Sequence, residues 1–262
     1  MFKLSKKFDF IVYKTKEDAF LALAKDMIDV IKTNNNNNKN TVMIIPVGPV
    51  GQYSYFVDLV NKENISLKNV TFINMDEYMT TKTEVISADS YLSFTKFMNE
   101  EVYNKIKAEL NVLQENRIVP SPKNPNHVLE VIKKHGYVDA CYGGIGVNGH
   151  VAFNEPENIT QKEFLNLQTR VVKIASETLV MNSLNEIDGA YYNMPKYAIT
   201  IGFKEIMSSK KIRLYTFRPW HKSVIKKMAV SRPTVKFPVT LLQKHPNIKI
   251  GLIEDIKPME LK

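Results

Sequence analysis

The sequence contains a single cysteine, Cys141, among 262 residues. An intramolecular disulfide and a zinc site built from cysteines are therefore excluded, and a lone thiol favours a reducing compartment. No stretch approaches the roughly 20 apolar residues that a membrane-spanning helix needs. Charged residues interrupt Met1–Phe10, where a signal peptide would have a continuous apolar core. We therefore expect a cytoplasmic protein without a membrane partner.

The chain also lacks a dense block of basic residues, although its net charge is +9. Its lysines are dispersed, which is typical of a solvated surface rather than of a nucleic-acid-binding face. We expect no nucleic-acid partner, and a net positive field would suit an anionic small substrate. The composition, 44% hydrophobic and 24% charged, is ordinary for a globular protein of this length, which needs no metal to hold a core.

Apolar, β-branched runs alternate with segments of helical spacing. The runs predict strands at Phe8–Tyr13, Thr41–Pro46, Asn69–Met75, Tyr137–Gly146, Tyr197–Ile201, Ile212–Phe217 and Ile248–Ile253. The helical spacing predicts helices from Thr15 to about Lys32, through Tyr55–Val60, from about Tyr91 to Leu110, and at Val128–Lys134 and Val224–Met228. This alternation predicts an α/β fold with a mostly parallel sheet, helices on both faces, and a single domain over residues 1–262.

Two local signals refine the first part of this prediction. Thr15 and Asp18 are spaced as a capping box, which would satisfy the first free amides of a helix. The tract Asn34–Asn40 is of low complexity and polar, so we expect a surface loop there.

A carboxylate pair, Asp76 and Glu77, directly follows the strand predicted at Asn69–Met75. Ligands of open α/β sheets bind outside the carboxyl ends of the strands. A carboxylate buried there costs free energy unless it is hydrogen-bonded or used, and burial raises its pKa toward the range of a general base. The alternative is a helix cap or a turn without chemistry.

The segment Gly143–Pro156 combines glycines with His150, Glu155 and Asn148 after a buried strand. Glycines let the backbone approach a ligand and present its amides, as Gly144 and Gly146 could here. A histidine with a nearby carboxylate transfers protons near neutral pH, because the carboxylate orients the ring and stabilises its cation. Asn148 can accept a hydrogen bond from the ring but supplies no charge. The alternative is a glycine-rich turn with a surface histidine, and the density of polar groups favours function.

No cofactor or metal is predicted for this segment. Gly144, Gly146 and Gly149 match G-x-G-x-x-G, but the following residues do not have a helical pattern and the motif lies late in the chain. His150 and Glu155 lack a third ligand nearby, so we expect no metal site.

Two more loops could contact an anion. Gly48 and Pro49 lie between a strand and a helix, where a helix N-terminus could face an anion, but the Ser, Thr and Lys of a P-loop are missing. Arg218, His221 and Lys222 follow another strand and could form a cationic clamp. The alternative for this second loop is a helix start with solvated charges.

For the remaining candidate site residues, a structural role is the better explanation. We expect loop or helix-end positions without partners for His127, His135 and His245, and a packing role for Cys141 inside an apolar strand.

The strings TFINMDEY (Thr71–Tyr78) and GGIGVNGHVAFNEP (Gly143–Pro156) resemble the glucosamine-6-phosphate deaminase (isomerase) family. The similarity continues through Asp89–Phe94, Met194–Gly202, Leu241–Asn247 and Met259–Lys262. The residues after His150 differ from those of the related 6-phosphogluconolactonases. The resemblance implies a modified Rossmann-like α/β fold without a nucleotide cofactor. It also implies a reaction that opens an amino-sugar ring, moves a proton between C2 and C1, and releases ammonia.

By the same resemblance, three residues carry the reaction. Asp76 would abstract the C2 proton, His150 would be the ring-opening acid and base, and Glu155 would be its carboxylate partner. Lys222 would correspond to a site lysine of the family if one residue is inserted before it.

Three positions depart from the family pattern. Asn148 stands where the family has Asp, although relatives acting on galactosamine 6-phosphate resemble this chain there. The segment Val47–Val50 replaces a hydroxyl-bearing T-G-G-T phosphate loop, and Leu184 replaces the Arg of an N-S-R string.

The main hypothesis is an isomerase and deaminase of an amino-sugar phosphate. One alternative is a non-catalytic sugar-phosphate sensor, suggested by the altered phosphate loop, and another is a 6-phosphogluconolactonase-type hydrolase. We expect a small-molecule sugar phosphate as partner and leave homo-oligomerisation open. The expected substrate contacts are Gly48, Pro49, Glu77, Gly144, Gly146, Arg218, His221 and Lys222.

Overall fold

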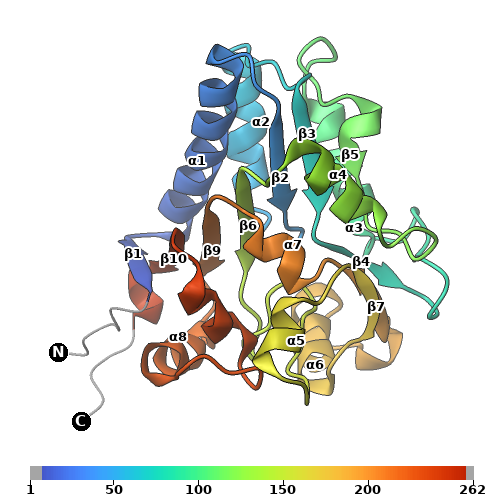
Figure 1. Ribbon diagram of the computed structural model, residues 1–262, viewed down its shortest axis with the longest axis vertical. Helices are drawn as coiled ribbons and strands as arrows, with labels where there is room; N and C mark the ends of the chain where they lie inside the picture. Colours follow the sequence, from blue (N-terminus) through green and yellow to red (C-terminus); the bar gives the residue numbers. More distant parts are fainter. Residues whose placement is uncertain (1–7, 258–262) are drawn as a thin grey trace.

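The computed structural model describes residues 8–257. The string Met259–Lys262 and the first seven residues lie outside this range. The main sheet has seven parallel strands in the order β1-β10-β9-β6-β2-β3-β5 (Figure 1). Their bounds are β1 (Asp9–Tyr13), β10 (Ile248–Ile253), β9 (Ile212–Thr216), β6 (Ala140–Gly144), β2 (Thr41–Ile45), β3 (Val70–Asn74) and β5 (Arg117–Ile118). The predicted α/β fold with a mostly parallel sheet is confirmed.

Helices cover both faces of this sheet. In β2, Met43 and Ile45 pack into one hydrophobic core, whereas Val42 and Ile44 pack into another. Successive side chains of a strand point to opposite faces, so a strand covered on both sides is apolar throughout. The first core includes residues of α1 (Lys16–Asn36), α2 (Gln52–Lys62) and α3 (Phe94–Glu101). The second includes residues of α4 (His127–His135), α5 (Gln161–Leu165), α7 (Phe203–Met207) and part of the buried face of α8 (His221–Val230).

A second, antiparallel sheet lies beside the main one, and the sequence analysis missed it. Its order is β4-β8-β7, with β4 (Asp76–Met79), β8 (Tyr197–Thr200) and β7 (Arg170–Lys173). Met75 joins the two sheets, because its amide donates to Ile45 and its carbonyl accepts from Ile201. The junction places Asp76 at the carboxyl end of β3 and simultaneously at the start of β4.

Two predicted helix boundaries were wrong. The helix expected over about Tyr91–Leu110 is only α3, followed by a 3₁₀ turn at Tyr103–Lys105. Val102 leaves helical geometry between them, with φ −121° and ψ −70°, so the apolar pattern continues across a break. By contrast, α1 is longer than predicted. It extends to Asn36 and thus includes part of the asparagine tract expected to be a loop. The capping box of Thr15 and Asp18 is present as predicted.

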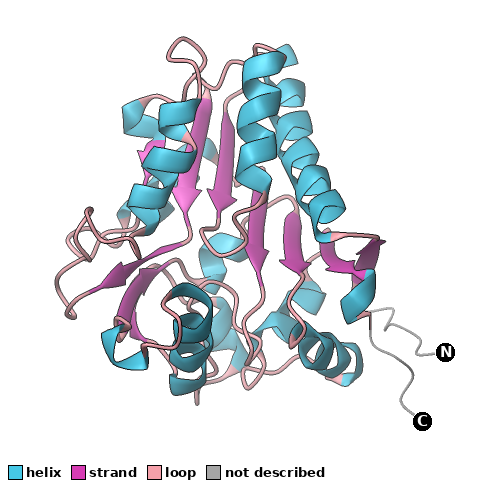
Figure 2. Cartoon of the chain, turned by 180° about the vertical axis from the view of Figure 1, so that it is seen from behind, coloured by secondary structure: helices cyan, strands magenta, loops and turns pink. Residues whose placement is uncertain are grey.

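All parallel strands end at the same side of the molecule. Figure 1 shows the arrows of β2 and β3 pointing toward the region that holds α5, α8 and α6 (Ser176–Glu186), and Figure 2 shows the same arrangement from behind. Further 3₁₀ turns occur at Gln114–Asn116, Tyr191–Asn193, Pro238–Lys244 and Glu254–Ile256. Within residues 8–257, no helix has the length and hydropathy needed to cross a membrane.

Candidate active site

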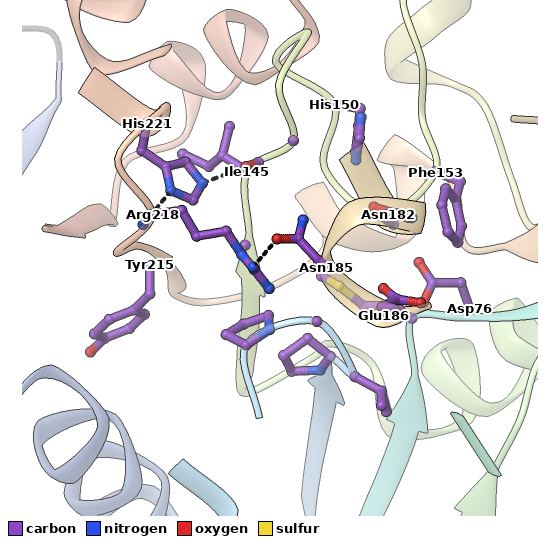
Figure 3. A pocket seen from close by; sticks show the side chains of 18 of the residues that line it. Asp76, Ile145, His150, Phe153, Asn182, Asn185, Glu186, Tyr215, Arg218 and His221 are labelled. Atoms are coloured by element: carbon purple, nitrogen blue, oxygen red, sulfur yellow. Dashed lines mark hydrogen bonds between the residues drawn. The ribbon is translucent and has the colours of Figure 1, made fainter. Parts of the chain in front are cut away.

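A pocket opens at the carboxyl ends of β2, β6 and β9, as expected for an open parallel sheet. Asp76 and His150, which are 74 positions apart in the sequence, both line it (Figure 3). Gly48 and Pro49 contribute from the loop after β2, and Gly144 and Gly146 contribute from the end of β6. The pocket therefore gathers the chemically distinctive segments of the sequence.

Asp76 is a buried carboxyl group that faces the pocket. The residue is 8% exposed, and among residues 8–257 its side chain has no hydrogen-bond partner. Burial raises the pKa of its carboxyl group well above the usual range, and the nearby charges of Glu77 and Glu186 raise it further. A carboxyl group with a raised pKa and open access to a cavity has the properties of a general base.

Glu77 does not line this pocket, contrary to its predicted substrate contact. Its carboxylate accepts hydrogen bonds from the amides of Phe94 and Thr95 at 2.9 and 2.7 Å, and from the hydroxyl of Ser93. It therefore satisfies free amides at the start of α3, where a negative charge is stabilised by the helix dipole. This is the helix-cap alternative considered for the Asp76–Glu77 pair.

His150 is held by the acceptors around its Nδ1 atom. This nitrogen lies 2.8 Å from the side-chain oxygen of Asn148 and 3.2 Å from Oε2 of Glu155. Because the Asn148 amide nitrogen donates to Glu155, its oxygen faces the ring and accepts. We assign the ring proton to Nδ1 on these contacts. The Nε2 atom then has a free lone pair, and it has no hydrogen-bond partner among residues 8–257.

Glu155 lies behind His150 as a permanent carboxylate. Burial acts to raise its pKa, but the charge and hydrogen bond of His150, with hydrogen bonds from Asn148 and Thr178, outweigh burial and lower the pKa to about 2. Glu155 can therefore orient the ring and stabilise its cation throughout the neutral range. Asn148 completes the arrangement by linking Glu155 to Glu177 with bonds of 2.6 and 3.1 Å.

Two glycines shape the loop that carries His150. A Cβ atom at Gly146 would lie 1.9 Å from the His150 ring, so only glycine leaves space for it. Gly149 has φ +82°, a conformation that glycine adopts without strain. The amide of Gly149 donates to Gly146, so the G-x-G-x-x-G stretch forms a turn and does not begin a helix. Residues 8–257 contain no group of three potential His, Cys, Asp or Glu metal ligands.

Of the three residues predicted to form a cationic clamp, only Arg218 places a positive charge in the pocket. His221 lines the pocket, but its Nδ1 accepts from the Arg218 amide at 2.9 Å and its Nε2 lies 2.9 Å from the carbonyl oxygen of Ile145. Burial lowers the pKa of His221 to about 4, so the ring is neutral and fastens two loops together. Lys222 is exposed and does not line this pocket. Arg218 lines it and donates to the side chain of Asn185 (Figure 3).

A polar group on α6, not predicted from the sequence, faces the pocket. Asn182, Asn185 and Glu186 line the pocket together. Asn182 donates to the Tyr78 hydroxyl at 2.8 Å, and this hydroxyl donates to Glu186 at 3.3 Å. The only signal in the sequence is the spacing i, i+3, i+4, which puts the three residues on one helical face. Such spacing is common on solvated helices and does not by itself indicate a site.

Two of the three histidines expected to be unpartnered have clear partners. His135 lies 3.3 Å from Asp139, and the Nε2 atom of His245 lies 2.7 Å from the carbonyl oxygen of Ser209. These contacts join segments of the fold away from the pocket. Cys141 is buried in the second core, consistent with its predicted packing role.

Curated relatives align with most of this chain. A glucosamine-6-phosphate deaminase of Alkaliphilus metalliredigens is 32% identical over 213 residues, which cover 79% of this chain and 81% of the relative. A glucosamine-6-phosphate deaminase of Clostridium perfringens is 31% identical over 255 residues, covering 94% and 96%. No family model matches the chain.

Solved structures share the fold. A monomeric glucosamine-6-phosphate deaminase of the NagB superfamily superposes with a TM-score of 0.82 at 24% identity, covering 95% of this chain and 98% of its own. A 6-phosphogluconolactonase from Shewanella baltica superposes with a TM-score of 0.70 at 14% identity, covering 96% and 99%. At these identities the two structures support the fold and not the chemistry.

Proposed function

This chain belongs to the glucosamine-6-phosphate deaminase family, and from that premise we propose that it is an enzyme that deaminates an amino-sugar phosphate. The substrate is glucosamine 6-phosphate or its galactosamine epimer, and the products are a ketose 6-phosphate and ammonia. The observation that carries the proposal is that Asp76 and the His150–Glu155 pair line or border one pocket. The unpaired Cys141 supports a cytoplasmic location within the same proposal.

The first chemical task is to open the sugar ring, and His150 performs it. Its free Nε2 accepts the proton of the C1 hydroxyl and returns a proton to the ring oxygen, so the C1–O5 bond breaks and the aldehyde forms. Glu155 lies 3.2 Å from Nδ1 and stabilises the imidazolium that exists between these two transfers. Asn148 keeps the ring in place through its side-chain oxygen.

The second task is proton transfer between C2 and C1, and Asp76 performs it. Its carboxylate removes the C2 proton, the aldehyde oxygen takes up a proton that the C2 ammonium group gives up, and an enolamine results. The proton held by Asp76 then returns to C1. The resulting imine at C2 takes up one water and loses ammonia, which leaves a ketone at C2. A buried carboxyl group with a raised pKa is suited to both removing and returning the proton.

The anionic end of the substrate contacts Arg218. This guanidinium lines the same pocket as Gly48 and Pro49, and a planar guanidinium binds phosphate oxygens in pairs. The backbone of Gly144 and Gly146 offers the remaining contacts on the floor of the pocket.

A direct assay tests the proposal. The purified protein is incubated with glucosamine 6-phosphate and with galactosamine 6-phosphate, and ammonia and ketose 6-phosphate are measured. Equal amounts of both products are expected. Ligand-induced thermal stabilisation without either product would favour the sugar-phosphate sensor, which the absence of hydroxyl side chains in Val47–Val50 motivates. Hydrolysis of 6-phosphogluconolactone in a parallel assay would favour a lactonase.

A further inference from the structure

Glu186 is an acidic residue whose position is electrostatically unfavourable in the free protein. It is the last residue of α6, where the helix dipole opposes a negative charge. Although the residue as a whole is exposed, its carboxyl group lines the pocket beside that of Asp76 (Figure 3). Burial of this group raises its pKa to about 7, against the lowering effects of the Tyr78 hydrogen bond and the Arg218 charge.

No cation within the described residues forms an ion pair with Glu186. Arg218 attracts it, but no contact of 4 Å or less joins the two groups, and the guanidinium donates to Asn185 instead. The other charged or titratable groups that face Glu186 are Asp76 and the Tyr78 hydroxyl. Two neighbouring carboxyl groups thus share a pocket wall without a cation between them.

Asp76 provides a second and independent indication that a ligand belongs here. It is more than nine-tenths buried, lines the pocket, and has no hydrogen-bond partner among residues 8–257. A buried polar side chain without a partner is costly unless a ligand supplies one. The missing partner of Asp76 is a hydrogen-bond donor. A cationic donor would serve both carboxyl groups, because within the described residues Glu186 accepts only the 3.3 Å hydrogen bond from Tyr78 and has no ion pair.

We propose that Glu186 binds the ammonium group at C2 of the substrate and thereby selects amino sugars over sugars that carry a hydroxyl group there. The inference rests on the proposed function in one respect, which is that Asp76 removes the C2 proton. The hydrogen and the nitrogen are attached to the same carbon, so the nitrogen must lie close to Asp76. Glu186 is the carboxyl group adjacent to that position.

The same contact prepares Asp76 for its role. The neighbouring charge of Glu186 raises the pKa of Asp76 in the free protein. A bound ammonium group adds a positive charge next to both carboxyl groups and therefore lowers both pKa values. Amine binding thus favours the ionised Asp76 that proton abstraction requires, whereas a neutral hydroxyl group does not.

Two open-chain ligands test the inference without turnover. The reduced amine 2-amino-2-deoxyglucitol 6-phosphate and the matched alcohol glucitol 6-phosphate differ only at C2, and neither can isomerise. Their dissociation constants are measured by calorimetry at pH 7.5 on the wild-type protein, on Glu186→Gln, and on Glu101→Gln. Glu101 is a partly exposed carboxylate on α3 that pairs with Lys105 and does not line the pocket.

The wild type should bind the amine at least roughly 10-fold more tightly than the alcohol, as expected for a charge-assisted hydrogen bond. Glu186→Gln should reduce this ratio to within about 3-fold, and Glu101→Gln should retain it. A folded Glu186→Gln that keeps the wild-type ratio would overturn the inference, and Glu186→Met serves as the second variant if the first does not fold. Equal binding of both ligands to the wild type would overturn it without any variant.

If the protein is not a deaminase, the experiments give a different result from the one expected if Glu186 does not bind the amine. A protein that is not a deaminase produces no ammonia from either hexosamine phosphate, yet the amine preference and its loss in Glu186→Gln can still be measured. Conversely, turnover with no amine preference would contradict the role of Glu186 and leave the deaminase proposal intact.

Discussion

The Nδ1 atom of His150 lies 3.2 Å from the Oε2 atom of Glu155, and both side chains are largely buried. The pair fixes which ring nitrogen carries the proton, and it leaves Nε2 available to a ligand. Asp76 reaches the same pocket from the junction of the two sheets. The proposed acid–base groups therefore come from different segments, β4 and the loop after β6, and are held by different contacts, so each can be tested separately.

Replacing Asp76 with asparagine should abolish proton transfer without harming the fold. The rate should fall on the order of 10²–10⁴-fold, since an amide cannot accept the C2 proton. The raised pKa of Asp76 means that the native state resists ionisation, so the substitution should leave the melting temperature equal or higher at neutral pH. Turnover and thermal unfolding are measured on the same preparation. An unaffected rate would refute the assignment of Asp76 as the base.

Glu155→Gln should change the pH dependence of stability. The folded pKa of Glu155, about 2, lies below the ordinary glutamate value of 4.5. Its contribution is therefore present above about pH 4.5 and lost as the pH falls through about 2. Because one pKa unit corresponds to about 1.4 kcal/mol, the variant should lose on the order of 3–4 kcal/mol at neutral pH. Urea unfolding is measured from pH 2 to 7. The difference in the free energy of unfolding between the variant and the wild type should decrease toward low pH.

Gly146→Ala should displace the His150 ring, because the added Cβ atom would lie 1.9 Å from it. We expect turnover to fall at least about 10-fold, the effect of a catalytic group moved out of alignment. Gly48→Ala is the control for folding, since a Cβ atom there meets nothing within 4 Å. The control should retain the wild-type melting temperature. Full activity of Gly146→Ala would show that the ring position is not critical.

Arg218→Ala should weaken the binding of the phosphate group. A charge-assisted hydrogen bond contributes about 1.5–3 kcal/mol, which corresponds to a KM for the sugar phosphate raised roughly 10–100-fold. The effect on kcat should be smaller, because the guanidinium is assigned to the phosphate group and takes no part in the proton transfers at C1 and C2. Arg232→Ala removes an exposed arginine that does not line the pocket and should leave KM unchanged. A normal KM for Arg218→Ala would place the phosphate elsewhere.

The parallel sheet could be predicted from the sequence because its strands are buried on both faces. Thr41–Ile45 is buried at every position, and such a run predicts a strand without reference to its neighbours. The antiparallel strand β4 could not be predicted from the sequence. Asp76–Met79 is also buried throughout, but it is a short strand with two acidic residues, and only its pairing with β8 defines it.

The proposed proton-transfer residues were likewise visible in the sequence, because His150 and Glu155 lie within one glycine-containing segment and Asp76 directly follows a buried strand. The prediction of three clamp residues was wrong for a physical reason. Burial and two hydrogen bonds make His221 a neutral structural residue, and Lys222 is exposed and does not line the pocket. Residue type alone predicted a charge, whereas burial decided whether the charge exists.

The sequence by itself determined the alternation of strands and helices and the family resemblance, and it pointed to Asp76, His150 and Glu155 as the proposed acid–base groups. These properties are local, since they depend on side-chain type and on spacing within a few residues. Tertiary structure alone decided that Asp76 shares a pocket with His150 and that Glu186 stands beside it. Such relationships arise because segments far apart in the sequence lie side by side in the fold. The pKa values of these groups depend on burial, which no short stretch of sequence encodes.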